Sequence, residues 1–131
     1  MEDKKITEKK FSIIQRMKSF THALDGLVVF YKTTPNAWIQ TIIFICVIIM
    51  GFYFNITHDE WAMLVFACGL VIMAEAFNTA IEIDIDLTSP NFHPYARDTK
   101  DVAAGAVLIA AITSVIIAIF IFGPYVWAIM K

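Results

Sequence analysis

Three long stretches of apolar residues constrain this chain more than any other feature of its sequence. Residues 37–54 contain no charged side chain and reach about 27 Å as a helix, close to the hydrocarbon thickness of a bilayer. Residues 61–83 form a second stretch, and residues 102–123 a third, which we expect to kink or end at Gly123 and Pro124. Backbone polar groups inside a membrane must be hydrogen-bonded within the protein, so these stretches predict three transmembrane helices. The predicted fold class is all-α and integral to a membrane.

The composition excludes several classes of soluble protein. Of 131 residues, 59% are hydrophobic and 17% are charged, whereas a soluble domain has about 45–50% and about 25%. The net charge of −2 offers no basic surface for nucleic acid. The chain has neither a GxxxxGK[ST] motif nor a kinase-type glycine loop, its two cysteines lie in apolar stretches, and its three histidines lack metal-ligand spacing.

The region before the first span differs from the rest and divides the chain into residues 1–33 and a three-span domain over residues 34–131. Apolar residues recur at helical spacing among basic ones in residues 8–33, which predicts an amphipathic helix. We expect it to lie on the membrane surface, to pack on the bundle's cytoplasmic face, or both. Its apolar positions are Phe11, Ile14, Met17, Leu24 and Leu27.

The distribution of positive charge predicts the topology. Seven of the ten Lys and Arg residues precede the first span, and the turn at residues 55–60 has none. The loop at residues 84–101 carries Arg97 and Lys100. The positive-inside rule therefore places the N-terminus and this loop in the cytoplasm. The seven residues before the first span are Lys4, Lys5, Lys9, Lys10, Arg16, Lys18 and Lys32.

The second span carries polar residues where a membrane tolerates them poorly. Glu75, Asn78 and Glu82 follow one helix face, and Asp86 continues the row. An acidic residue at the bilayer centre costs about 2.5–3.5 kcal/mol on insertion scales, so this row is expected to face a cleft rather than lipid.

Two kinds of chemistry suit such a row. Carboxylates at the cytoplasmic face can hold Mg²⁺, and a further one can take a proton from a lipid hydroxyl, while Lys100 beside Asp101 supplies a cation for phosphates. This predicts phosphate transfer from MgATP to a membrane alcohol. A proton or cation path lined by Glu75 and Glu82 is the alternative, although it has no need of Lys100.

The chain also resembles a known family. The run from Glu75 through Asn78 to Glu82, with the pattern ExxNxAIE, is followed by Asp86, His93 and the sequence ARDTKDVAAGAV. Together these are similar to the signature of the small prokaryotic diacylglycerol kinase and undecaprenol kinase family. Weaker similarity extends back through NAWIQ at residues 36–40 and KSFTHALDG at residues 18–26.

The resemblance implies a surface helix and three transmembrane helices, assembled as a homotrimer with shared active sites in the bacterial cytoplasmic membrane. The enzyme would use ATP and Mg²⁺ to phosphorylate diacylglycerol or undecaprenol. Glu75 would be the catalytic base and Glu82 the metal ligand, with Asn78 and Asp86 in supporting roles. The nucleotide would be bound by Glu82, His93, Lys100 and Asp101.

Three positions depart from the family pattern. Thr34 stands where many members carry a second metal-binding glutamate, and it offers a neutral oxygen without charge. Gln15 and Ala104 replace a nucleotide-contacting arginine and a hydroxyl near the lipid. Thr34 therefore leaves open a second hypothesis, in which a catalytically weakened relative serves as a membrane scaffold or partner subunit.

Overall fold

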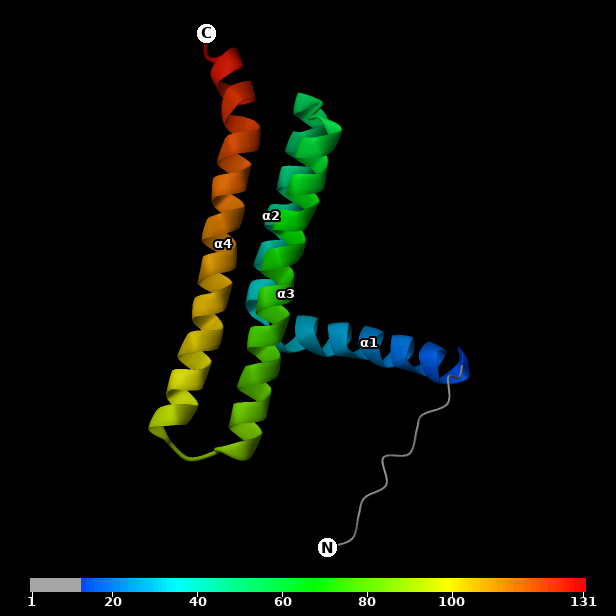
Figure 1. Ribbon diagram of the computed structural model, residues 1–131, viewed down its shortest axis with the longest axis vertical. Helices are drawn as coiled ribbons and strands as arrows, with labels where there is room; N and C mark the ends of the chain where they lie inside the picture. The colour runs from blue at the N-terminus through cyan, green and yellow to red at the C-terminus, as the bar shows by residue number, and fades with distance from the viewer. Residues whose placement is uncertain (1–12) are drawn as a thin grey trace, which may run out of the picture.

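The computed structural model describes residues 13–131, which fold into four helices (Figure 1). α2 (Pro35–Phe54), α3 (His58–Thr88) and α4 (Pro94–Ile129) run side by side, and α1 (Ile13–Thr33) leaves this bundle at a steep angle. No strand occurs among residues 13–131. The all-α prediction is confirmed. Phe11 and the lysines before it, which belong to the predicted surface helix, lie outside the described residues.

The three bundle helices are each long and apolar enough to cross a membrane, as the sequence predicts. α3 and α4 are longer than the expected spans, with 31 and 36 residues. At 1.5 Å per residue these lengths are about 46 and about 54 Å, well beyond the hydrocarbon thickness of about 30 Å. Both helices therefore continue past the level of α1 (Figure 1), and we call this part of the bundle the α1 end.

The third span does not end at Gly123 and Pro124, so the prediction of a helix end there was wrong. α4 continues through Pro124 to Ile129, and the Met130 N–H still bonds to the carbonyl of Val126, at 3.2 Å. A proline inside a helix lacks the N–H that would bond to the residue four positions earlier. Pro124 removes that one bond near the end of a long helix, and the remaining backbone pairs carry the helix past it.

α1 is an amphipathic helix whose apolar side chains have no cover within the described chain. Ile14 and Met17 are 68% and 67% exposed, and Leu24 and Leu27 are also exposed. Phe30, near its C-terminal end, is the only buried residue of this helix. α1 therefore joins the bundle at that end and presents its apolar residues outward, which favours the membrane-surface position over packing on the bundle.

The opposite end of the bundle, where residues 55–57 join α2 to α3, is called the turn end. Thr57 and Glu60 form a reciprocal capping box that begins α3. Trp61 packs so closely on Gly51 that a Cβ added there would lie 2.7 Å from the indole ring. A small core forms around these residues, with Ile56, Leu64, Ile121 and Phe122 buried.

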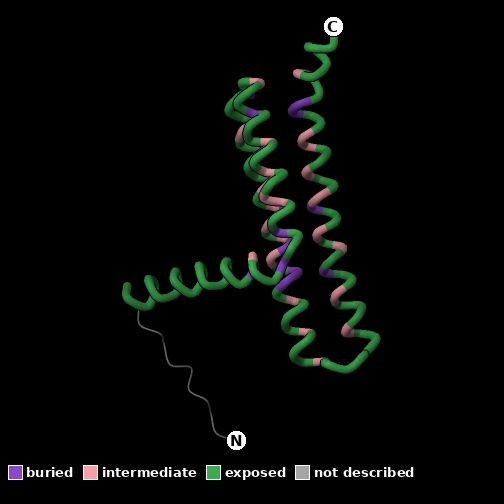
Figure 2. The backbone as a smooth tube through the Cα atoms, turned by 180° about the vertical axis from the view of Figure 1, so that it is seen from behind, coloured by how far each residue is buried: buried purple, intermediate pink, exposed green. Residues whose placement is uncertain are grey.

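α3 and α4 pack against each other through small residues. Ala67, Ala103 and Ala110 are buried, and the Ser114 hydroxyl donates to the carbonyl of Ala67 at 2.9 Å. Small side chains allow membrane helices to approach closely. Buried residues are few along the outer parts of the bundle and gather where α1, α2 and α3 meet (Figure 2).

Candidate active site

Glu75 is the only buried Asp or Glu among residues 13–131, with 3% of its surface exposed. Two amides on α2 hold it: Asn36 Nδ2 donates to Oε1 at 3.3 Å, and Gln40 Nε2 donates to Oε2 at 2.9 Å. Asn36 and Gln40 are four residues apart, so they project from the same face of α2 toward α3. Both oxygens of the Glu75 carboxylate therefore have a hydrogen-bond donor from the neighbouring helix.

A second contact between α2 and α3 lies beside this carboxylate. The hydroxyls of Thr34 and Thr79 are 2.7 Å apart, and both residues are buried. Thr34 is the N-cap position of α2, although its side chain makes no capping bond there. The hydroxyl pair takes the place of a cap contact and fixes the beginning of α2 against the middle of α3.

One turn further along α3, Asn78 and Glu82 form the next polar pair of the predicted row. Asn78 Nδ2 donates to Glu82 Oε1 at 3.0 Å. Asn78 is buried, and its Oδ1 atom has no hydrogen-bond partner among residues 13–131. Glu82, in contrast, is exposed. The row therefore passes from a buried carboxylate at Glu75 to an accessible one at Glu82 over seven residues, about 10 Å along the helix.

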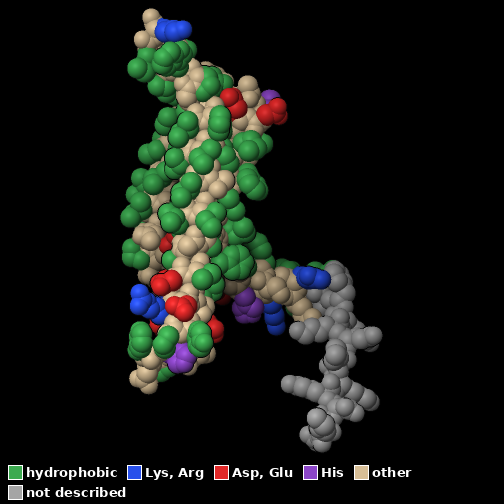
Figure 3. Space-filling view, turned by 60° about the vertical axis from the view of Figure 1, so that its left-hand side comes forward, with side chains coloured by type: hydrophobic (Ala, Val, Ile, Leu, Met, Phe, Trp, Pro, Cys, Tyr) green, Lys and Arg blue, Asp and Glu red, His purple; other side chains and the backbone are tan. Residues whose placement is uncertain are grey.

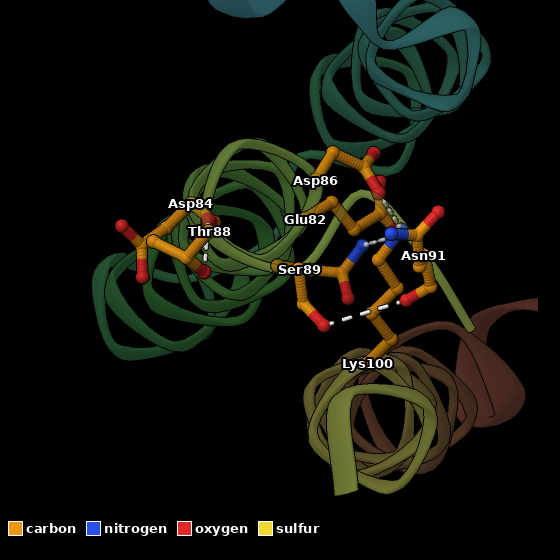
Figure 4. Close-up of polar contacts among 8 residues, drawn as sticks. Glu82, Asp84, Asp86, Thr88, Ser89, Asn91 and Lys100 are labelled. Atoms are coloured by element: carbon orange, nitrogen blue, oxygen red, sulfur yellow. Dashed lines mark hydrogen bonds and ion pairs between the residues drawn. The ribbon is translucent and has the colours of Figure 1, made fainter. Parts of the chain in front are cut away.

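Asp86 extends the row and pairs with Lys100 across the gap between α3 and α4. Lys100 Nζ donates to Asp86 Oδ1 in an ion pair. Figure 4 shows Glu82, Asp86 and Lys100 on the same side of α3, while Asp84 and Thr88 lie on its opposite side. The spacing in the sequence thus selects which acidic residues face α4.

A hollow of about 290 Å³ lies next to this ion pair, between the end of α3, the following loop and the beginning of α4. His93, Arg97, Lys100 and Asp101 line it together with Asp86. The structure brings the predicted nucleotide residues His93, Lys100 and Asp101 together here. Charged side chains gather at this end of the molecule (Figure 3).

Lys100 and Asp101, although adjacent in the sequence, have different partners. Asp101 Oδ2 lies 3.6 Å from Arg97 Nε, with both side chains exposed, whereas Lys100 turns to Asp86. His93 is the N-cap residue of α4, without a capping bond from its side chain, and its ring lies 5.6 Å from that of Tyr95. These three side chains are accessible rather than buried in the fold.

A magnesium ion fits this site only with ligands from outside the described chain. No group of three or more His, Cys, Asp or Glu residues in the range 13–131 is placed to hold a metal ion. Mg²⁺ commonly keeps several waters and binds one or two protein oxygens together with substrate phosphates. The exposed Glu82 carboxylate and the unpartnered Oδ1 of Asn78 are two suitable oxygens on adjacent turns.

Three residues of this site have no role in the prediction from sequence. Asn36 and Gln40 hold Glu75, and Thr79 pairs with Thr34. Two amides four residues apart, at the beginning of a stretch without charge, were a usable signal because buried amides in a membrane need partners. Thr79 gave no such signal, since a threonine within a helix usually bonds to its own backbone.

The comparisons with known proteins decide what this arrangement belongs to. The family model described as prokaryotic diacylglycerol kinase matches residues 21–122, a range that includes every residue of this candidate site. The chain belongs to this family. Its relatives include the undecaprenol kinase of Bacillus subtilis, which is 37% identical over 82% of this chain and 87% of the relative. The diacylglycerol kinase of Helicobacter pylori strain J99 is 31% identical over 86% of this chain and 88% of the relative.

As a prokaryotic diacylglycerol kinase family member, the chain is a bacterial membrane protein, and its enzyme class is that of lipid kinases acting on an alcohol group. A more distant relative, the diacylglycerol kinase of Escherichia coli K12, is 26% identical over 74% of this chain. The names of these relatives include two lipid alcohols. Family membership therefore gives the reaction class, and the choice of lipid depends on the site itself.

Proposed function

We propose that this family member transfers the γ-phosphoryl group of ATP, with Mg²⁺, to the primary hydroxyl of a membrane lipid at the cytoplasmic face. The observation that carries this proposal is the buried Glu75 carboxylate, which lies one turn from the Asn78–Glu82 pair. A carboxylate at this place is suited to take the proton of a lipid hydroxyl. The lipid would be diacylglycerol or undecaprenol, the two named for the relatives.

In this proposal the site residues have different roles, according to their position along the bundle. Glu75, held by Asn36 and Gln40, accepts the hydroxyl proton. Lys100 leaves Asp86 for the phosphates, and Asp101 and His93 line the same hollow. When bound, Mg²⁺ supplies positive charge against the phosphate oxygens, and Glu82 with Asn78 would hold it. Most of the rate enhancement comes from positioning and charge neutralisation.

The same proposal includes the orientation and the assembly. The basic N-terminal segment and the 84–101 loop lie in the cytoplasm, so that the hollow faces ATP. The site residues of one chain leave Glu82 and the hollow exposed, which supports a homotrimer whose neighbouring chains complete each site. The membrane is the bacterial inner membrane.

The test is phosphate transfer from labelled ATP by the purified full-length protein in mixed micelles, with diacylglycerol and undecaprenol offered in parallel. We expect Glu75→Gln to lower turnover by about 100-fold or more, the range for loss of a general base. Glu60→Gln is the matched control, because Glu60 lies at the turn end and bonds to Thr57 and Tyr125. Full activity of Glu75→Gln would remove Glu75 from the role of base.

One observation favours a second candidate, a non-catalytic membrane scaffold or partner subunit. Thr34 and Thr79 satisfy each other, so the position expected to carry a second metal-binding glutamate offers no charge and no free hydroxyl. Absence of transfer to either lipid by the well-folded wild-type protein, across a wide range of Mg²⁺ concentration, would support the scaffold and contradict the kinase.

A further inference from the structure

The corner between α1 and α2 removes the usual partner of one backbone carbonyl. In a continuous helix the carbonyl of Tyr31 would accept the N–H of residue 35, but that residue is Pro35, which has no N–H. The indole of Trp38 takes this place, since its Nε1 donates to the Tyr31 carbonyl at 2.9 Å. A side chain of α2 therefore caps the C-terminal end of α1.

A second contact crosses the same corner. The hydroxyls of Tyr31 and Thr41 are 3.0 Å apart, and the Thr41 hydroxyl donates to the carbonyl of Ala37 at 2.8 Å. Because the single proton of the Thr41 hydroxyl goes to Ala37, the Tyr31 hydroxyl is the donor in the first pair. The rings of Tyr31 and Trp38 also pack edge to face, with centroids 5.2 Å apart. We call Tyr31, Trp38 and Thr41 the corner brace.

The corner brace has a buried neighbour on one side and an exposed ring on the other. Phe30 is 5% exposed, and its ring packs edge to face on Tyr31 at a centroid distance of 5.2 Å. Trp38, in contrast, is 57% exposed. A smaller ring at Trp38 therefore leaves no cavity in a core, and its effect can be assigned to the lost hydrogen bond.

The corner brace and the amides that hold Glu75 lie on opposite faces of α2. Successive residues of a helix are about 100° apart, so Asn36 and Gln40 are about 40° from each other, and Trp38 and Thr41 about 60°. The two pairs are about 150° apart around the helix axis. α1 thus contacts one face of α2, while the other face presents two donors to the Glu75 carboxylate.

A small rotation of α2 is enough to break the bonds to Glu75. Side chains reach about 5–6 Å from a helix axis, so a rotation of about 20° moves their ends by about 2 Å. The bond of 2.9 Å between Gln40 Nε2 and Glu75 Oε2 does not survive such a displacement. The Thr34–Thr79 pair holds α2 at a single point before its first residue, which allows the helix to turn.

We propose that the corner brace fixes the rotation of α2 and so positions the amides of Asn36 and Gln40, and through them the Glu75 carboxylate. Trp38 is then a positioning residue, which acts on the reaction only through Glu75. The inference rests on the proposed function, in which Glu75 takes the proton of the lipid hydroxyl. It also connects the position of α1 to the geometry of the base, since α1 supplies the carbonyl that Trp38 caps.

The first test observes this geometry without catalysis. The chain has two glutamines, Gln15 and Gln40, so nitrogen-isotope labelling of glutamine side chains gives two amide signals by NMR of the full-length protein in micelles. Gln15 is exposed and Gln40 is bonded to Glu75, so the signals should differ, and Gln40→Leu assigns them. Trp38→Phe keeps a ring beside Tyr31 and removes the N–H. We expect it to move the Gln40 signal at least halfway to that of Gln15.

Trp127→Phe is the matched control for this measurement. Trp127 is 64% exposed and lies near the C-terminal end of α4, with Lys131 over its ring. The variant makes the same change of ring at the turn end, so both glutamine signals should stay in place. Equal shifts with Trp38→Phe and Trp127→Phe would show a general response to the loss of an exposed indole and would overturn the inference.

The second test separates kcat from KM. Trp38→Phe should lower kcat for the lipid by about tenfold or more, since misplacement of a reacting group by about 1 Å can cost about 100-fold. KM for ATP should not change, because Lys100 and Asp101 belong to α4, whereas the corner brace joins α1 to α2. A rise in KM for ATP as large as the fall in kcat would contradict the proposed role.

Thr41 provides a second variant with a conservative rescue. Thr41→Val removes the hydroxyl that accepts from Tyr31 and nearly keeps the shape of the side chain. It should move the Gln40 signal in the same direction as Trp38→Phe and lower kcat a few-fold. Thr41→Ser keeps a hydroxyl and should restore both. An unmoved Gln40 signal in Trp38→Phe and Thr41→Val would exclude the corner brace, whatever the turnover.

The third test asks whether Trp38 acts through Glu75. In the Glu75→Gln background the base is already absent, so Trp38→Phe should lower turnover no further. A loss that multiplies with that of Glu75→Gln would show an independent effect and overturn the inference. If the wild-type protein transfers no phosphate while Trp38→Phe still moves the Gln40 signal, the positioning of the amide is supported and the kinase function is contradicted instead.

Discussion

At the turn end of the bundle, Glu60 accepts hydrogen bonds from the backbone and hydroxyl of Thr57 and from the hydroxyl of Tyr125. At the α1 end, Glu75 also has its donors, yet the amide oxygens of Gln40 and Asn78 have no hydrogen-bond partner within residues 13–131. Both glutamates belong to α3, Glu60 at its beginning and Glu75 in its second half. All the hydrogen bonds around Glu60 are made within the fold. The surroundings of Glu75 keep free acceptor oxygens that a ligand or water can use.

The packing of the side chains also differs between the two ends of the bundle. The turn end has a core of aromatic and aliphatic side chains fitted around Gly51, whereas the α1 end has buried hydroxyls, a buried carboxylate and an accessible hollow. Buried polar groups that lack a hydrogen-bond partner reduce stability, and they are tolerated where a ligand supplies the missing partner. The comparison therefore predicts that changes at the turn end affect stability, and changes at the α1 end affect activity.

The largest effect is expected from Lys100→Met at the α1 end. The change removes the cation that pairs with Asp86 and that the proposed function assigns to the phosphates, so kcat/KM should fall by about 100-fold, as for loss of one charge-stabilising donor. Arg97→Met is the control, because Arg97 pairs with the exposed Asp101 and should cost only a few-fold. Thermal unfolding of both variants should match that of the wild type. Equal losses of activity would mean that the two cations share the phosphates.

Gly51→Ala examines the turn end. The added Cβ would lie 2.7 Å from the Trp61 ring, so the aromatic packing must shift, and overpacking of this kind costs about 1–3 kcal/mol. Gly123→Ala is the matched control at the same end, since an added Cβ there meets no atom of another part of the described chain within 4 Å. Unfolding in mixed micelles should show the loss for Gly51→Ala alone, with turnover per folded molecule unchanged. A stable but inactive Gly51→Ala protein would contradict the division between the two ends.

Thr34→Glu tests whether charge is the missing element at the α1 end. A carboxylate beside Thr79, the residue that follows Asn78, adds an anionic oxygen, so half-maximal activity should need about tenfold less Mg²⁺, equivalent to about 1.4 kcal/mol in binding. Stability should fall, because the hydroxyl pair with Thr79 is lost and a charge is buried. Thr33→Glu puts the same charge on the exposed neighbouring position. A Mg²⁺ titration that shifts equally in both variants would indicate a general effect of surface charge.

The sequence was sufficient to predict the fold and the helix face on which the site residues lie. Long uncharged stretches leave a chain few alternatives inside a membrane, and the spacing of Glu75, Asn78, Glu82 and Asp86 fixes one helix face. The sequence did not predict how deeply each of these side chains is buried or which residue it bonds to. Local spacing predicts that four residues share a face, but not that Glu75 is buried while Glu82 is exposed.

Contacts between helices were also beyond the sequence. The bonds of Glu75 to Gln40, of Thr79 to Thr34 and of Lys100 to Asp86 join residues that are 14 to 45 positions apart. They depend on how the helices are rotated against one another, which small residues such as Ala67 and Ala110 determine by close packing. The continuation of α4 through Pro124 has a different cause, since the backbone hydrogen bonds of the rest of the helix outweigh the one bond that the proline removes.

Tyr125→Phe gives the smallest effect and the finest test of the comparison. The variant keeps the ring between Phe54 and the rest of the core and removes only the hydroxyl that donates to Glu60 at 2.8 Å. The loss of one such bond costs about 0.5–1.5 kcal/mol, so unfolding should shift slightly while turnover and Mg²⁺ dependence stay the same. Tyr53→Phe, at an exposed ring of the same end, should show no shift. A change in turnover with Tyr125→Phe would mean that the two ends of α3 are coupled, and the turn end would then belong to the working part of the molecule.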